Sequence, residues 1–571
     1  MKRITRHRMG FHPKIVINIK QDLTIISRSV FLLFEFVLGI FAVGFTYPIR
    51  GNQFVYFARV KQSMTGLPVS DWFIDSKDSN AFFTLICKIL IINNNYLLVN
   101  LLNLTLVFFG FHFLNTSAIS FMSIQKFSLS HLLIILLSTA GLINFFPDFH
   151  NGIAGMGFFS AQFQPSSFDC LLLVSLCVAV NKDRSKSRLI YLKFMAPMAI
   201  AILIHPSIAL SSCLLLISFI VSRLKCAEEL ILSGAHTYRF FLISILFLIP
   251  LLLNFFPIEN VFYTKQQLSA FDYFARVRIP YHTMPAVFFN FEDFVRLAII
   301  LLALWLIFRI YGMDISQKLL LLFAVSLSFY SVVVAYLVDK PVINLSIPWR
   351  ILGGLYPFFA LLLLWIALDF LCKLQNRGQY FQLGIFLLLI ILVLFAFNMN
   401  RFLLIFLTIF MIRTINLSMP NYYILRIISR KVLISCLCIT MFMISFQKEI
   451  ATWNAWQVNN TAFPISNLLT SMQNQGIGAV PPQFDNFRVD FGLDIYVDER
   501  AAPYDPNSLV NWVNRLELAE KIQINPELIC NHIQLKGISW AIVPKSVIKP
   551  SCFSQSSSID SNWILITNRI K

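Results

Sequence analysis

Two aspartates stand four residues apart in the run Asp71-Trp72-Phe73-Ile74-Asp75. On a helix, that spacing puts both carboxylates on one face. A pair of carboxylates can act as a general base or hold a divalent metal ion. The alternative is a helix at a membrane surface with a solvated acidic edge. We take Asp71 and Asp75 as candidate catalytic acids, and the residues alone leave both interpretations open.

A third acid occurs where Pro and Gly interrupt an apolar stretch, in the run Pro147-Asp148-Phe149-His150-Asn151-Gly152. Broken segments of this kind line cavities. Asp148 is therefore a further catalytic candidate and, with Asp71, a possible metal ligand. His150 is a candidate cavity residue, although a histidine in a loop is more often hydrogen-bonded and structural.

His205, which is followed by Pro206 at the end of an apolar stretch, is a second candidate cavity residue. A lone histidine in such a place is also more often structural. Asp169 stands near the start of another apolar stretch, where it faces either a cavity or a neighbouring helix.

Basic side chains that suit a phosphate gather in the run Arg276-Val277-Arg278-Ile279-Pro280-Tyr281-His282. Arg350, which follows Pro348-Trp349, is a further candidate. The guanidinium group binds phosphate oxygens through two parallel hydrogen bonds. These residues predict a phosphate or pyrophosphate site, and general binding of lipid head groups is the alternative.

The composition indicates whether the protein that carries these residues is soluble or lies in a membrane. Of the 571 residues, 57% are hydrophobic and 13% are charged, and the mean hydropathy is +0.71. A soluble globular chain has about twice that share of charge. The composition therefore excludes a soluble enzyme, a coiled coil, a disordered scaffold and a small disulfide-stapled module. The net charge of +18 falls in short runs between apolar stretches, which favours a membrane protein over a partner of nucleic acid.

The apolar stretches predict an all-α polytopic membrane protein with about thirteen transmembrane helices and a small extracytoplasmic α/β domain at its C-terminus. The distribution of Lys and Arg favours a cytoplasmic N-terminus. The expected spans are centred near residues 38, 105, 138, 173, 197, 214, 247, 303, 328, 361, 388, 407 and 438.

This layout divides the chain into a basic cytoplasmic head (1–28), a membrane part (29–446) and an outer tail (451–571). Three outer loops are too long to be simple connectors, and we expect function on the side of the membrane that they face. They span residues 48–80, 147–165 and 257–292. Between the first of these loops and the second span, Ala81–Ile92 is predicted to be an amphipathic helix at the membrane surface.

In the tail, Asp505-Pro506 predicts the start of a helix, because Asp is a good N-cap and Pro fits the first helical turn. Short strands are expected at Phe487–Phe491, Asp494–Asp498, Trp540–Val543 and Trp563–Thr567. Asp490, Asp494 and Asp498 alternate with apolar residues, which predicts a strand face exposed to water. Cys530 and Cys552 either form a disulfide or remain two unrelated thiols. We expect the tail to act as a lid over the outer end of the membrane part.

The sequence has no P-loop, which argues against ATP-driven transport within this chain, and it has no Gly-x-Ser-x-Gly hydrolase motif and no His-Glu-x-x-His zinc motif. The sequence also shows no obvious internal repeat, which argues against an inverted-repeat transporter.

Several tail and loop motifs carry a resemblance to a known superfamily. They include Pro481-Pro482-Gln483-Phe484, Tyr496-Val497-Asp498-Glu499, Trp512-Val513-Asn514-Arg515-Leu516, Gly537-Ile538-Ser539-Trp540 and Arg278-Ile279-Pro280-Tyr281-His282. With the loop layout, they make the chain similar to the GT-C-type membrane glycosyltransferases, which use polyprenyl-phosphate sugars, and to a bacterial branch of multi-pass proteins among them. The resemblance covers most of the chain.

The resemblance implies sugar transfer from a polyprenyl-phosphate donor on the outer face of a bacterial inner membrane. It implies an acid of the outer loops as general base, a basic loop group for the lipid phosphate and, as a possible cofactor, a divalent metal. The superfamily usually has an acid just after the first span, whereas this chain reads Arg50-Gly51-Asn52-Gln53-Phe54 there. The alternatives are a lipid or polysaccharide transporter and a non-catalytic protein of envelope assembly.

Overall fold

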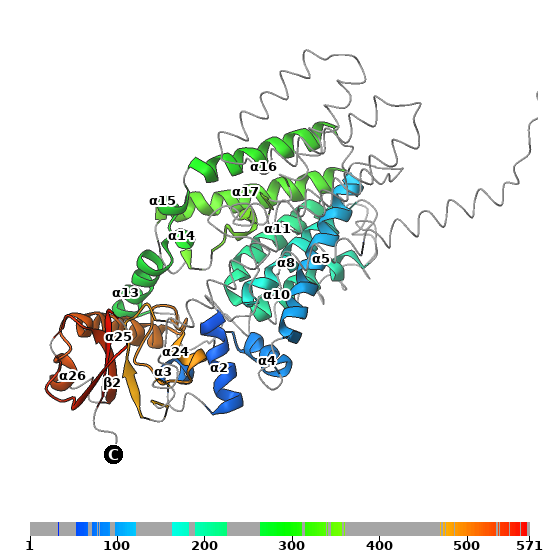
Figure 1. Ribbon diagram of the computed structural model, residues 1–571. Coiled ribbons are helices and arrows are strands. Elements are labelled where there is room, and N and C mark those ends of the chain that lie inside the picture. Colours follow the sequence, from blue (N-terminus) through cyan, green and yellow to red (C-terminus); the bar gives the residue numbers. More distant parts are fainter. Residues whose placement is uncertain are drawn as a thin grey trace, which may run out of the picture.

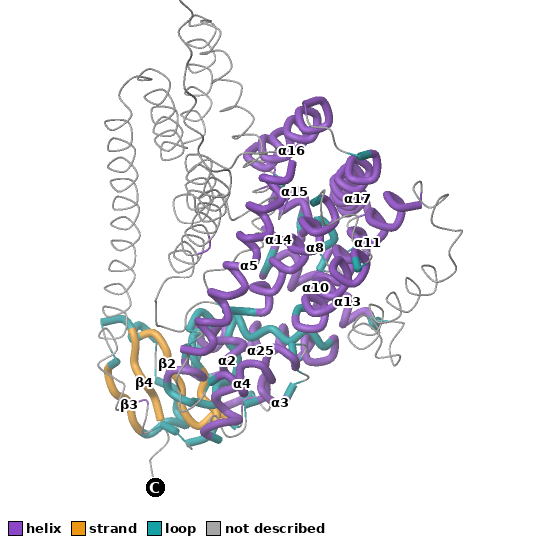
Figure 2. The backbone as a smooth tube through the Cα atoms, turned by 90° about the vertical axis from the view of Figure 1, so that its right-hand side faces the viewer, coloured by secondary structure: helices purple, strands orange, loops and turns teal. Residues whose placement is uncertain are grey.

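The computed structural model describes, apart from short gaps, residues 53–121, 163–224, 263–359 and 469–567. These parts are mostly helical, with one four-stranded sheet near the C-terminus (Figure 1). Figure 2 shows the sheet at one end of the described part, with helices extending away from it.

Long apolar helices form a bundle at the end away from the sheet (Figure 1). Within it, α8 packs against α5 and α10, and α11 packs along α17. All of α8 except Leu171 is buried, and Phe194 stacks on Phe219 with ring centroids 4.0 Å apart. The members of the bundle are α5 (Leu97–Phe121), α8 (Cys170–Val180), α10 (Ile190–Ile204), α11 (Ala209–Leu224), α16 (Phe291–Ile310) and α17 (Ile315–Val338).

The predicted fold class, with about thirteen transmembrane helices, is wrong for this structure. Among the described residues, only two helices, Leu97–Ser117 and Ile315–Val338, are long and apolar enough to cross a membrane. The expected spans near 173, 197 and 214 are shorter apolar helices of 10–17 residues. They are short because Pro165 and Pro206 start new turns there. The expected span near 303 carries charged residues close to both ends of α16.

Some expected spans cannot be compared with the structure. Those near 38, 138, 247, 388, 407 and 438, and most of the one near 361, lie outside the described residues.

The first expected outer loop contains two helices, α2 (Gln53–Thr65) and α3 (Trp72–Asp75), and is followed by a third, α4 (Ala81–Leu90); together they lie between the bundle and the C-terminal part. The separate helix predicted at Ala81–Ile92 is confirmed as α4. It buries Phe83, Thr84 and Cys87 and exposes large apolar side chains at Phe82, Leu85 and Ile89.

The third expected outer loop forms a chain of short helices. It comprises α13 (Lys265–Tyr273), the π-helical turn η5 (Phe274–Arg278), α14 (Pro280–Thr283) and α15 (Pro285–Phe288). The helix α13 packs against the tail, where Phe271 and Phe274 join the same apolar cluster as Trp512.

The tail is an α/β unit. Its strands are β1 (Ile477–Ala479), β2 (Ile538–Pro544), β3 (Gln555–Ser558) and β4 (Trp563–Thr567), in the order β1-β2-β4-β3. The β1–β2 pair is parallel and the other two pairs are antiparallel. Gly478 lies against the ring of Trp540 so closely that a Cβ atom would overlap it. The helices of the tail are α24 (Phe487–Asp490), α25 (Pro506–Ile524) and α26 (Leu528–Asn531).

The helix predicted from Asp505-Pro506 is confirmed as α25, where the Asp505 side chain accepts a hydrogen bond from the Ser508 amide at 2.9 Å. The strands predicted at Trp540–Val543 and Trp563–Thr567 are confirmed as β2 and β4. Cys530 and Cys552 form a disulfide.

Two other strand predictions are wrong. Phe487–Phe491 forms the helical turn α24, in which Phe487, Arg488 and Val489 are all buried. The segment Asp494–Asp498 has no strand partner beyond one bridge from Ile495 to Gly478. The expected wet face of acids is wrong at two of its three positions, because Asp494 and Asp498 are buried, whereas Asp490 is exposed. Asp498 can be buried in spite of its charge because it forms an ion pair with a buried arginine, as described below.

Candidate functional site

Asp169, His205 and Arg350 come from three separate segments and meet at one point. The Nδ1 atom of His205 lies 2.8 Å from Oδ1 of Asp169, and the Arg350 guanidinium forms an ion pair with Oδ2 of the same carboxylate. The Asp169 side chain is fully buried, whereas those of His205 and Arg350 are 14% and 10% exposed. The sequence predicted both basic residues as candidates but left the position of Asp169 open.

A serine extends this group. The Ser207 hydroxyl lies 2.7 Å from Nε2 of His205, so Asp169, His205 and Ser207 form a continuous relay. A carboxylate that accepts from one imidazole nitrogen fixes the tautomer in which the other nitrogen can take a proton from a hydroxyl. We refer to Asp169, His205, Ser207 and Arg350 as the Asp169 cluster.

Local sequence explains how the first two residues are presented. Asp169 ends the 3-10 helix η3 (Pro165–Asp169), which begins with a reciprocal cap between Gln164 and Ser167. His205 ends α10, because Pro206 lacks an amide hydrogen and disfavours helical geometry at the residue before it. The turn η4 (Pro206–Ile208) then leads into α11.

Arg350 follows a strained turn. Ile347 has a φ of 46°, a left-handed conformation that is unfavourable for a β-branched residue. The turn is held by Ser211, whose hydroxyl donates to the Ile347 carbonyl at 2.7 Å, and by the Arg350 amide, which donates to the same carbonyl at 3.1 Å. Trp349 is buried and packs on Phe288 with ring centroids 5.2 Å apart. Strain of this kind persists where the surroundings fix it, often at functional sites.

The helix α2 borders the Asp169 cluster. Gln53 donates a hydrogen bond to the carbonyl of Phe163 at 3.3 Å, a few residues before Asp169. Tyr56 packs edge-on against Phe83 at 5.4 Å, and Phe83 contacts Phe163 at 5.1 Å. Burial raises the pKa of Tyr56, as do nearby Tyr504 and Asp169, while Arg350 lowers it. The helix that follows Gly51-Asn52 therefore packs next to the segment that carries Asp169.

Asp71 occupies a different place. Its carboxylate accepts hydrogen bonds from Nε of Arg488 at 2.7 Å and from the Ile495 amide at 3.2 Å, and from the Phe73 amide at 2.9 Å. Arg488 also pairs with Asp498. We call these three side chains the Asp71–Arg488–Asp498 network, and all of them are buried.

The electrostatics of this network explain why it is tolerated in the interior. Burial alone would lower the pKa of Arg488, but the carboxylates of Asp71 and Asp498 raise it above its ordinary value. Burial raises the pKa of Asp498, while Arg488 and the Ala501 amide oppose that effect. Asp71 thus joins the first loop to the tail, and both of its carboxylate oxygens accept hydrogen bonds from protein donors.

The remaining predicted acids do not join the Asp169 cluster. Asp75 ends α3 and is exposed; it does not share a face with Asp71, which is the N-cap of that helix. Asp148 and His150 lie outside the described residues.

The predicted basic loop group is divided among several contacts. Arg276 forms an ion pair with Asp272 at 2.6 Å, with both side chains well exposed. Arg278 donates from Nε to the carbonyl of Glu499 at 2.6 Å, so it holds the tail. His282 lies in α14. Of the four predicted phosphate ligands, Arg350 is the one that the structure brings to the Asp169 cluster.

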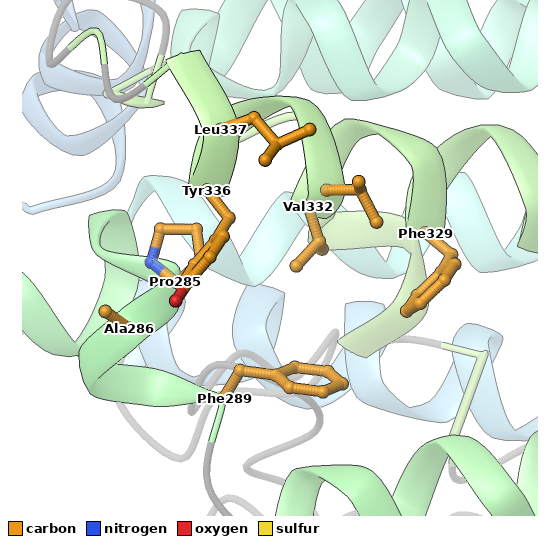
Figure 3. A pocket seen from close by; sticks show the side chains of 8 residues that line it. Pro285, Ala286, Phe289, Phe329, Val332, Tyr336 and Leu337 are labelled. Carbon is orange, nitrogen blue, oxygen red and sulfur yellow. The ribbon is translucent and has the colours of Figure 1, made fainter.

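An apolar groove of about 410 Å³ runs between α15 and α17 (Figure 3). Side chains of the two helices line it from either side (Figure 3). The lining residues are Pro285, Ala286, Phe289, Phe329, Val332, Val333, Tyr336 and Leu337. The groove offers apolar surface and one phenol, so it suits a hydrocarbon chain better than a reacting group.

Within the described ranges, no group of three or more His, Cys, Asp and Glu side chains is arranged to hold a metal ion. Asp71, a predicted metal ligand, forms an ion pair with Arg488 instead. Sequence reasoning missed Ser207, Arg488 and Asp498 as site or network residues. Only the spacing of Ser207 from His205 and the isolated basic charge of Arg488 among tail acids could have pointed to them.

No family model, no curated protein and no solved structure matches this chain.

Proposed function

We propose that this protein is a membrane-embedded glycosyltransferase, and that the Asp169 cluster transfers the sugar from a polyprenyl-phosphate donor to an acceptor hydroxyl. The observation that carries the proposal is the pairing of an imidazole and a guanidinium with one buried carboxylate, in the ion pairs His205–Asp169 and Arg350–Asp169. The imidazole can accept a proton, and the guanidinium can bind a phosphate.

In the proposed step, the acceptor hydroxyl takes the position of the Ser207 hydroxyl on Nε2 of His205. The acceptor oxygen bonds to the anomeric carbon as the bond from that carbon to the phosphate oxygen breaks. The proton passes to His205, and the lipid phosphate leaves beside Arg350. Asp169 orients the imidazole and stabilises its charged form, which is the usual role of a carboxylate behind a histidine base.

A lipid-linked donor is supported by apolar surfaces on α15, α16 and α17. The groove between α15 and α17 could hold part of a polyprenyl chain. The helices also expose aromatic and aliphatic side chains that would be costly in water, such as Trp305 (58% exposed), Tyr330 (64%) and Leu337 (74%).

The bond between Cys530 and Cys552 supports a tail in an oxidising compartment, outside the cytoplasm. In this proposal the Asp169 cluster faces the same side, the outer face of a bacterial inner membrane.

The test uses the full-length protein in lipid nanodiscs with a set of radiolabelled polyprenyl-phosphate sugars and a membrane extract as the source of acceptor. We expect His205→Gln to lower the rate of sugar consumption about 10²–10⁴-fold and Arg350→Lys to raise the donor KM. His112→Gln is the matched control, because His112 stacks on Phe108 within α5. Consumption of no donor by the wild-type protein, or full activity of His205→Gln, would refute the proposal.

A further inference from the structure

The Ser207 hydroxyl lies where a serine can become a nucleophile. It is 2.7 Å from Nε2 of His205, and Nδ1 of the same ring is 2.8 Å from Oδ1 of Asp169. A carboxylate only accepts hydrogen bonds, so Nδ1 carries a proton and, in the neutral ring, Nε2 accepts the hydrogen bond from Ser207. This order of contacts, from hydroxyl to imidazole to carboxylate, is the one that activates the serine of acyl-transfer enzymes.

Local structure holds Ser207 against His205 and leaves it within reach of a substrate. The two residues flank Pro206 in the turn between α10 and α11. Within that turn, the Ile208 amide donates to the carbonyl of His205 at 3.2 Å. Ile208 and Ala209 are buried, whereas Ser207 is half-buried. The hydroxyl is therefore held by packed neighbours and remains partly open to solvent.

Positive charge lies beside this serine. The imidazole of His205 and the guanidinium of Arg350 bind the two oxygens of one carboxylate, Oδ1 and Oδ2 of Asp169. The two basic groups are therefore neighbours across that carboxylate. A guanidinium held in this way stabilises negative charge that develops on a substrate oxygen. Ser207 also precedes the 16-residue helix α11, whose dipole favours negative charge at the same end.

An apolar surface lies next to the segment that carries Arg350. The preceding residue, Trp349, is buried and packs on Phe288 of α15 with ring centroids 5.2 Å apart. The residue after Phe288, Phe289, lines the apolar groove between α15 and α17 (Figure 3). The groove is thus one pair of aromatic rings away from the segment of Arg350. Such a surface suits a hydrocarbon chain.

We propose that Ser207 is the nucleophile of a second activity of this protein, the cleavage of carboxylic esters that carry an apolar acyl chain. This inference goes beyond the proposed sugar transfer and does not rest on it. His205 is the base in both reactions, and Asp169 orients it. In sugar transfer the acceptor hydroxyl takes the place of Ser207 on Nε2, so the two reactions would take place in turn.

In the first step, the Ser207 oxygen bonds to the carbonyl carbon of the ester while its proton passes to Nε2 of His205. The carbonyl oxygen then carries a negative charge, which Arg350 stabilises. As the carbonyl re-forms, the bond from its carbon to the alcohol oxygen breaks, and His205 gives its proton to the leaving alcohol. A water molecule, deprotonated by the same imidazole, then releases the acid and restores Ser207.

The test uses full-length protein in lipid nanodiscs and a fluorescent fluorophosphonate, which phosphonylates activated serine hydroxyls. We expect an adduct on Ser207, located by peptide mass spectrometry. Ser207→Ala should abolish the labelling, and His205→Gln should slow it about 10²–10⁴-fold, because the base is lost. Ser63→Ala is the matched control. The Ser63 hydroxyl donates to the carbonyl of Val60 at 2.7 Å rather than to an imidazole, so its loss should leave the labelling unchanged.

Turnover is measured on the same preparation with p-nitrophenyl esters of acetate, hexanoate and decanoate. We expect the rate to rise with chain length and to be lost in Ser207→Ala. No adduct on Ser207 of the wild type, labelling of His205→Gln at the wild-type rate, or unchanged turnover in Ser207→Ala would overturn the inference. Fastest cleavage of the acetate would overturn the apolar acyl chain. Sugar transfer is assayed in parallel: transfer without labelling refutes this inference alone, and labelling without transfer refutes the proposed function alone.

Discussion

Nε of Arg488 donates a hydrogen bond of 2.7 Å to Asp71, a residue 417 positions earlier in the chain, and both side chains are buried. Phe73 lies beside the same arginine, with the Arg488 guanidinium 5.4 Å and the Arg59 guanidinium 4.6 Å from its ring centroid. The first loop and the tail therefore fold as one structure around a charge that neither segment could bury alone.

Removal of Arg488 should destabilise the protein strongly. Arg488→Met leaves Asp71 and Asp498 buried without their cation, and we expect a loss of about 3–5 kcal/mol in the free energy of unfolding. Guanidinium-induced unfolding in micelles, followed by the fluorescence of the buried Trp512, measures it. Arg500→Met is the control, because Arg500 is exposed, and its effect should stay within about 0.5 kcal/mol. Equal stability of the two variants would contradict the role of the network.

This network marks the limit of what the sequence could predict. The types of His205 and Arg350 identified them as candidates, but their shared partner Asp169 depends on how η3, α10 and the Ile347 turn pack. Asp71 was predicted to be catalytic because it stands four residues from Asp75, and no residue near it in the sequence indicated an ion pair. Its partner comes from the tail.

Local signals succeeded where a local cause sets the structure. Asp505-Pro506 defines the start of α25 through its own backbone and cap. By contrast, β3 is a run of exposed polar residues and is a strand only because β4 pairs with it. Runs of apolar residues likewise indicated helices near 173, 197 and 214 but not their lengths, and the helices found there are shorter than a membrane span requires.

Gly478→Ala should destabilise the tail, because the added methyl group would overlap the ring of the buried Trp540. We expect a cost of about 1–3 kcal/mol, measured by thermal unfolding. Gly537→Ala is the control, since no atom lies within 4 Å of the Cβ position there. Similar melting temperatures for both variants would contradict the close packing of Gly478 in β1 against Trp540 in β2.

The disulfide should stabilise the tail. Cys530 and Cys552 close a loop of 22 residues, and closing a loop of that size is worth about 3 kcal/mol. Cys552→Ser, or reduction of the wild type, should therefore lower the stability of the tail by about that amount. Alkylation with a thiol reagent before and after reduction tests the bond itself, and modification of Cys530 before reduction would contradict it.

Glu527 should make the tail more sensitive to acid. Hydrogen bonds from the side chain and backbone of Ser551 lower the pKa of Glu527 below its ordinary value of 4.5. A carboxylate with a lowered pKa in the folded state contributes stability above that ordinary value and loses it as the pH falls through the folded pKa. Glu527→Gln should therefore cost stability at neutral pH and show a smaller decrease on acidification below 4.5. Glu517→Gln, on the exposed side of α25, should behave like the wild type.

The central claim is that Asp169 acts by orienting His205 as a base, and a double-mutant cycle on the rate of sugar transfer tests it most directly. Asp169→Asn should lower the rate in the wild-type background. In the His205→Gln background the same change should have little further effect, because residues that act as one unit are strongly non-additive. Rates that multiply independently in the double variant, or a fully active His205→Gln, would contradict the account.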